Sequence, residues 1–161
     1  MEVIMIDFLK TNKKMLMIVS VILAVVAFFT WPISIADKLG GNDGYYVVAV
    51  EYDSKAGKIG QDSLAYRFEV GDMKTEELRN ILNSYSCHRT LRTLTGKTSL
   101  ASEGMNYWIY IHSGKNAFNG YGAQEISLAG NIYHIGFFNN DKSTAFINEI
   151  RSFLETCETV E

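Results

Sequence analysis

The segment Met15–Ala36, with the sequence MLMIVSVILAVVAFFTWPISIA, contains no charged residue. At the helical rise of 1.5 Å per residue it reaches about 30 Å, which is the thickness of the hydrocarbon core of a bilayer. Its polar side chains Ser20 and Thr30 can form hydrogen bonds to the backbone of their own helix. The segment therefore predicts a transmembrane helix over residues 15–36, in contact with the lipid bilayer.

The charges on the two sides of this segment predict its orientation. Lys10, Lys13 and Lys14 precede it, whereas the first charged residue after it is Asp37. Because lysines collect on the cytoplasmic side of a membrane segment, we expect residues 1–14 to be a cytoplasmic basic N-terminus. The carboxyl-terminal part then lies outside, and the chain is a single-pass protein of the cell membrane with a signal-anchor helix.

A cleaved signal peptide is the alternative to a retained anchor. Ser34 and Ala36 supply the small residues that a cleavage after Ala36 requires, and Pro32 just upstream can keep this site extended. In that case the mature protein begins at Asp37 and is secreted. The apolar run is longer than the apolar region of most signal peptides, so the sequence favours the anchor.

The remainder of the chain has the size and composition of one folded domain. Residues 37–44 contain three glycines and predict a flexible tether, and residues 45–161 are expected to form an extracytoplasmic domain. From Asp37 onward the chain has 12 basic and 16 acidic residues, a mildly acidic balance without a basic patch. A nucleic-acid partner is therefore not expected.

The pattern of apolar residues predicts an α+β domain of the order β-β-α-β-β-β-β-α. Alternating or β-branched runs indicate strands, helical spacing indicates helices, and polar, glycine-rich stretches such as 53–62 and 113–122 indicate loops. The expected strands are 45–52, 63–70, 87–94, 105–112, 124–128 and 132–138, and the expected helices are 75–84 and 142–156. Strands joined by short loops pair in antiparallel fashion, and two helices cover one face of the sheet. We therefore expect two layers, with the other face of the sheet free of helices.

Cys87 and Cys157 are the only cysteines, and export would place them where disulfides persist. A disulfide between them would close a long loop and stabilise the domain by a few kcal/mol. The alternative is a buried free thiol, because Cys157 ends an apolar helical stripe. Cys87 and His88 are adjacent in a predicted strand, so their side chains point to opposite faces and do not form a catalytic pair.

No metal, cofactor or catalytic motif is complete in this sequence. The three histidines, at positions 88, 112 and 134, lack the short spacing of zinc ligands. Gly96-Lys97-Thr98 lacks the earlier glycine of a phosphate-binding loop, and Gly120-Tyr121-Gly122 lacks the last glycine of a dinucleotide motif. His112, His134 and Glu125 can converge across neighbouring strands, which is the one arrangement that suggests a hydrolase.

Aromatic residues are more numerous than a core of this size requires. Most of them are expected in the core, but rings near Trp108 and in the following loop can form an exposed contact surface, because aromatic side chains bring large contact area at low entropy cost. This predicted contact surface consists of Trp108, Tyr110, Phe118 and Tyr121.

In layout, the chain resembles small bacterial proteins with one amino-terminal membrane segment and one exported domain. The leading hypothesis is therefore an anchored domain that binds a protein or another component of the cell envelope. A hydrolase acting on the envelope and an immunity or inhibitor protein are the alternatives. No cofactor is expected, and a binding role is favoured over an enzymatic one.

Overall fold

The computed structural model describes residues 12–40, 43–53, 58–95, 107–120, 125–136 and 140–160. The chain divides into two compact units, Met1–Trp31 and Pro32–Glu161. Most of the expected cytoplasmic segment 1–14 lies outside the described residues.

The described part of the first unit, residues 12–31, contains the apolar helix α2 (Lys13–Thr30), none of whose residues is buried. Its mean hydropathy of 2.1 and its length of 18 residues are sufficient to cross a membrane. Met17, Ile18, Val21 and Leu23 are each more than half exposed. A helix of this kind is consistent with a membrane anchor or with a signal sequence.

The apolar segment does not continue as a helix to Ala36. The helix ends at Thr30, and Trp31 adopts an extended conformation with φ −63° and ψ 119°. Pro32 explains this end, because a proline disfavours helical geometry in the residue before it. Residues 33–39 form a short strand, β1 (Ile33–Ser34), and a short helix, α3 (Ile35–Leu39), of the second unit.

Part of the expected flexible tether is also folded. In α3, the hydroxyl of Ser34 accepts a hydrogen bond from the N–H of Asp37 at 3.1 Å, which caps the helix. Ile35 and Leu39 are 0% and 1% exposed and belong to the core. The prediction of a flexible tether is therefore wrong for residues 37–39, which belong to α3.

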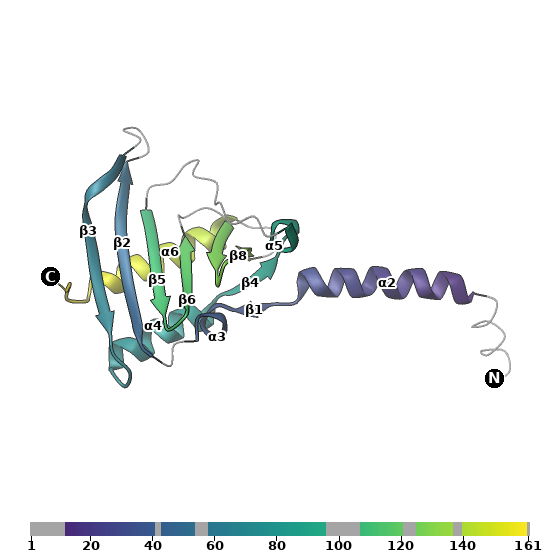
Figure 1. Ribbon diagram of the computed structural model, residues 1–161, viewed down its shortest axis with the longest axis horizontal. Helices are drawn as coiled ribbons and strands as arrows, with labels where there is room; N and C mark the ends of the chain where they lie inside the picture. Colours follow the sequence, from purple (N-terminus) through teal and green to yellow (C-terminus); the bar gives the residue numbers. More distant parts are fainter. Residues whose placement is uncertain are drawn as a thin grey trace. The chain divides into compact units, whose positions relative to one another are not determined.

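The second unit is built on one open antiparallel sheet of eight strands in the order β1-β4-β8-β7-β6-β5-β2-β3 (Figure 1). The strands after β1 are β2 (Tyr45–Asp53), β3 (Lys58–Phe68), β4 (Ser86–Arg89), β5 (Tyr107–Ser113), β6 (Asn116–Gly120), β7 (Glu125–Leu128) and β8 (Asn131–Ile135). The edges of the sheet are therefore β1 and β3.

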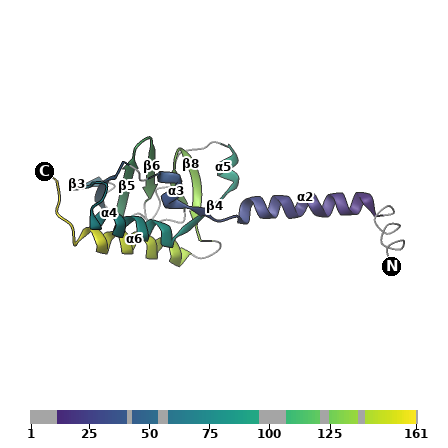
Figure 2. The same cartoon turned by 90° about the horizontal axis from the view of Figure 1, so that it is seen from below.

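Two helices, α4 (Met73–Ser84) and α6 (Asn140–Leu154), lie together against one face of the sheet (Figure 2). Helix α3 contacts α4 and also β6 and β7 on this side. The core lies between these helices and the sheet, and Phe118 and Phe146 are its largest fully buried side chains. The expected α+β class and antiparallel sheet are thus confirmed, with more strands and helices than the sequence pattern predicted.

The hairpin of β7 and β8 has the predicted tight turn. Ala129 and Gly130 connect the two strands with φ values of 49° and 77°. A two-residue turn with two positive φ values matches the twist of the strands that it joins. The expectation of a hairpin in this region is therefore confirmed.

Residues 58–62, expected in the loop 53–62, belong to β3 and pair in part with the end of β2. Two other segments also differ from the expected pattern. Residues 116–120, expected in a loop, form β6, where the Phe118 ring fills the space in which a Cβ atom on Gly120 would lie, 2.7 Å away. Residues 91–95, expected at the end of a strand, form one helical turn, α5 (Leu91–Thr95). In both cases the local composition was misleading because contacts with distant residues decided the conformation.

Candidate functional site

The face of the sheet opposite α4 and α6, here called the outer face, carries an unusual collection of polar and aromatic side chains. Because side chains alternate along a strand, the residues between the core positions point to this face. Strand pairing places the following residues there: Tyr46, Val48, Arg67, His88, Trp108, Tyr110, His112, Asn119, Glu125, Ser127 and His134. All three histidines of the chain lie on the outer face.

Aromatic rings on β5 and β2 form a strip on the outer face. The ring centroids of Trp108 and Tyr110 are 6.1 Å apart, and those of Tyr110 and His112 are 6.3 Å apart, with nearly parallel planes in both pairs. Tyr46 lies directly across from His112 on β2 and is 43% exposed. We call these four residues the aromatic strip. It presents flat, partly exposed ring surface next to hydrogen-bonding groups.

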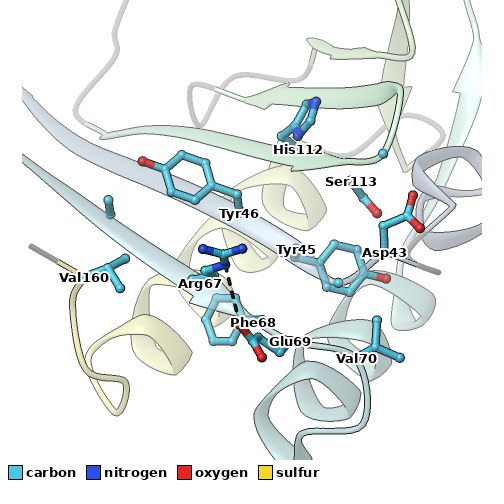
Figure 3. Close-up of a pocket in the computed structure, with 13 residues that line it drawn as sticks. Asp43, Tyr45, Tyr46, Arg67, Phe68, Glu69, Val70, His112, Ser113 and Val160 are labelled. Atoms are coloured by element: carbon cyan, nitrogen blue, oxygen red, sulfur yellow. Dashed lines mark ion pairs between the residues drawn. The ribbon is translucent and has the colours of Figure 1, made fainter.

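A groove of about 880 Å³ lies at the end of the aromatic strip (Figure 3). Tyr46 and His112 line it together with Arg67 of β3, and Asp43 and Val160 lie on its borders. Arg67 Nε is 3.7 Å from Glu69 Oε1, and both side chains are largely exposed. The groove therefore combines aromatic surface with charges of both signs.

The structure places only part of the predicted contact surface on the outer face. Trp108 and Tyr110 lie on the outer face and are half-buried, as a contact surface requires. Phe118 points to the other face, is 0% exposed and packs edge-on against Phe146 at 5.5 Å. Its inclusion is wrong, because β6 is a strand and places Phe118 in the core. Tyr121 lies outside the described residues.

Glu125 and His134 come together as predicted, but His112 does not join them. Glu125 and His134 are paired across β7 and β8, with His134 Nε2 3.6 Å from Glu125 Oε1. His112 lies on β5, which β6 separates from β7. The convergence of all three residues is therefore wrong, and its cause is the strand that residues 116–120 insert into the sheet.

Arg92 and His88, rather than His112, lie beside Glu125 and His134. Arg92 of α5 forms an ion pair with Glu125, and His88 of β4 lies directly across from His134. Sequence reasoning missed Arg92 because α5 was expected to be a strand. Within the described residues, no group of three or more His, Cys, Asp or Glu side chains is arranged to hold a metal ion.

The two cysteines are free thiols and lie far apart in the sheet. Cys87 is on β4 and is fully buried, whereas Cys157 follows α6 and lies near Tyr66 of β3. Five strands separate β4 from β3, which at about 4.8 Å per strand spacing excludes a disulfide geometry. The predicted Cys87–Cys157 disulfide is thus wrong. Burial raises the pKa of the Cys87 thiol to about 12, so it remains protonated and unreactive.

A second groove, of about 450 Å³, lies where α4 and β4 meet α6. It is lined by Tyr85, Ser86, Lys142 and Glu149, and the hydroxyl of Tyr85 donates a hydrogen bond to Glu149 at 2.7 Å. Burial and this hydrogen bond raise the pKa of Tyr85 to about 12. The hydrogen bond therefore joins the C-terminal end of α4 to α6. With its pKa raised, the Tyr85 hydroxyl stays protonated and is not a reactive group.

Comparison with protein families, with curated proteins and with solved structures finds no match for this chain. The function is therefore inferred from the structures of the two units, each taken by itself.

Proposed function

We propose that this protein is a single-pass membrane-anchored protein whose domain lies outside the cytoplasm and binds a protein or another envelope component through the outer face. The proposal joins two features of the chain: an apolar helix, none of whose residues is buried, and a folded domain with an aromatic strip on the face of its sheet opposite α4 and α6. The orientation follows from Lys10, Lys13 and Lys14, which lie before and at the N-terminal end of the helix.

The burial of Ile33, Ile35 and Ala36 supports retention of the helix over cleavage after Ala36. Ile33 and Ile35 are 8% and 0% exposed, and β1 pairs with β4 through Ile33 and Cys87. Cleavage after Ala36 would remove this strand and both isoleucines from the folded domain. Each truncation of a buried isoleucine costs about 2–5 kcal/mol, and a domain is stable by only about 5–15 kcal/mol. This burial is the observation that carries the anchor proposal.

The aromatic strip supports a binding role. Trp and Tyr are the residues in which interface binding energy is concentrated, because large rings lose little entropy when they are covered. On the outer face they stand between polar neighbours such as Asn119 and Ser127 rather than under a helix. This combination of apolar centre and polar surroundings is typical of a protein contact surface.

The hydrolase alternative has weaker support. Glu125 and His134 are close enough to act together, but Arg92 also occupies the carboxylate of Glu125. Neither Glu125 nor His134 lines the two grooves described above. The contacts of Glu125 with both Arg92 and His134 favour a structural role, in which Glu125 ties α5 and β8 to β7.

Membrane fractionation of cells that produce the full chain tests the anchor. We expect the protein in the membrane pellet after alkaline extraction, with an intact mass that includes residues 1–36. Protease added outside intact cells should digest the domain. A mature chain that begins at Asp37, or a domain that is digested only after lysis, would contradict the proposal.

Substitution in the aromatic strip tests the binding role. Tyr110→Ala in the full chain should weaken capture of the partner in membranes by about thirtyfold, which corresponds to the 2 kcal/mol of an interface hot spot. Leu91→Ala is the matched control, because Leu91 is 73% exposed but lies on α5, outside the strip. Equal capture by the two variants would remove the strip from the binding surface.

A further inference from the structure

Strand β3 forms an edge of the sheet that can accept another strand. It is the last strand in the sheet order and pairs with β2 on its inner side. From Ser63 to Phe68 this pairing is regular, because the register shift lies farther along, between Val50 and Tyr52. A regular edge strand presents backbone N–H and C=O groups that can pair with another extended chain.

The carboxyl-terminal segment already uses one of these groups. The backbone N–H of Val160 donates a hydrogen bond to the C=O of Ala65 at 2.8 Å, and Figure 3 shows Val160 beside β3. In an antiparallel strand the N–H and C=O of one residue point to the same side, and alternate residues share that side. The backbone groups of Ser63, Ala65 and Arg67 therefore point away from β2, toward the edge.

The side chains along this edge leave apolar surface uncovered. Leu64 is 46% exposed and Val160 is 45% exposed. The groove at the end of the aromatic strip begins at the same place, because Ala65, Arg67 and Val160 line it. An extended segment on the β3 edge would thus cover Leu64 on one side of the sheet and reach the groove on the other.

We propose that the edge of β3 from Ser63 to Phe68 binds an extended peptide segment of a protein partner, which joins the sheet as an added strand and displaces Val160. The inference rests on the proposed binding function and names the chemistry of the partner: backbone hydrogen bonds supply affinity, and an apolar side chain opposite Leu64 supplies selectivity. The incoming segment must break the hydrogen bond between Val160 and Ala65 and take the place of Val160.

Substitutions at two positions separate backbone pairing from side-chain contact. Val160→Pro removes the N–H that Ala65 accepts, whereas the matched variant Val160→Ala keeps it. Ala65→Pro removes an N–H that points to the edge and leaves the hydrogen bonds between β3 and β2 in place, which is why proline is tolerated on edge strands. Unfolding curves of each variant show whether the domain remains folded.

The probe is a phage-displayed library of random peptides, selected on the full Val160→Pro chain in lipid nanodiscs with counter-selection on Ala65→Pro. Selected peptides, resynthesised, should bind Val160→Pro about fivefold more tightly than Val160→Ala, which is the loss of one competing hydrogen bond. N-methylation at alternate peptide residues should abolish binding, because it removes the donors that pair with β3.

Several results would overturn the inference. These are the absence of any peptide enriched over the Ala65→Pro control, equal binding to the two Val160 variants, and insensitivity to N-methylation. Self-association of Val160→Pro without peptide, seen by sedimentation, would assign the edge to a second copy instead. A second selection without the Ala65→Pro counter-selection separates the two proposals: if its peptides lose binding in Tyr110→Ala but not in Ala65→Pro, the proposed binding face stands and only the edge is removed.

Discussion

Two apolar segments that follow each other in the chain have opposite surroundings. In α2, Ile22 and Leu23 are 54% and 62% exposed, whereas Ile35 and Leu39, a few residues later, are 0% and 1% exposed. Only Trp31 and Pro32 separate the last residue of α2 from the first residue of β1. The same kind of side chain is thus exposed in one segment and enclosed by the domain in the other.

The difference shows that hydrophobicity alone does not say whether the domain buries an apolar segment. A helix with apolar residues all round needs an apolar environment on every side, which a bilayer provides. Residues 33–39 instead place their apolar side chains on one side and satisfy their backbone in a strand and a capped helical turn. Pro32 ends α2 and so separates the exposed helix from the buried segment that follows it.

The largest expected effect comes from removing residues 33–36. A fragment that begins at Pro32 should fold, because it contains the whole second unit, whereas a fragment that begins at Asp37 should be unfolded. The loss of Ile33 and Ile35 from the core costs about 4–10 kcal/mol, which is comparable with the total stability of a domain, about 5–15 kcal/mol. Circular dichroism and urea titration of the two fragments measure the difference. Equal stability would place residues 33–36 with the anchor rather than with the domain.

Thiol labelling tests how firmly β1 covers β4. The thiol of Cys87 contacts the carbonyl of Ile33 at 3.5 Å, and its pKa is raised from 9 to about 12 by burial. At pH 8 the reactive thiolate is therefore about a thousandfold rarer than in the unfolded chain. In the native protein iodoacetamide should label Cys157 first, and Cys87 only after unfolding in urea, as mass spectrometry of the peptides will show.

The same thiol predicts a pH dependence. A raised pKa in the folded state means that burial favours the protonated thiol, so its contribution to stability is complete below pH 9. This contribution is lost as the pH rises from 9 toward 12. Cys87→Ala should flatten the decrease in unfolding free energy over this range, whereas Cys157→Ala should not. Rapid labelling of native Cys87 at pH 8 would mean that β1 detaches readily.

A single core substitution should have the next largest effect. Ile35→Ala should lower the free energy of unfolding of the domain by about 3 kcal/mol, because it leaves a cavity beneath α3. Ile22→Ala is the matched control, since it makes the same change in α2 and should leave domain stability unaltered. Urea titration of both full-length variants in detergent measures the contrast. Similar losses in the two variants would mean that α2 also stabilises the domain.

The smallest effect is expected at the cap of α3. Ser34→Ala should cost about 1 kcal/mol, because it leaves the N–H of Asp37 without its hydroxyl acceptor. Thr30, the last residue of α2, provides a comparison outside the domain, because its hydroxyl donates to the carbonyl of Ala27 at 3.5 Å. Thr30→Ala should not change domain stability. An unchanged unfolding curve for Ser34→Ala would show that the cap is dispensable once Ile35 is buried.

The strongly alternating strands and the long helices could be predicted from the sequence. Residues 107–112, with Ile109 and Ile111 on one face, form β5, and the apolar stripe of Leu78, Ile81 and Leu82 faces the core from α4. Strands β6 and β1 could not be predicted in this way. Asn116–Gly120 is polar and glycine-containing, and Ile33–Ser34 continues an apolar run, so each is a strand only because a neighbouring strand pairs with it.

The candidate site was predictable to a similar extent. The alternation of Trp108 and Tyr110 with buried isoleucines placed them on the face opposite the core, and hairpin pairing brought Glu125 to His134. The ion pair of Arg92 with Glu125, the core position of Phe118 and the separation of Cys87 from Cys157 depend on strand order. Strand order joins residues far apart in the chain, which local periodicity does not report.

By itself, the sequence determined that a long apolar helix precedes a mixed α+β domain, because charge, helical rise and residue alternation are local properties. Only the tertiary structure decided where the helix unit ends and the domain begins. That boundary depends on which isoleucines find partners in the sheet, and burial of a side chain is a property of the whole fold.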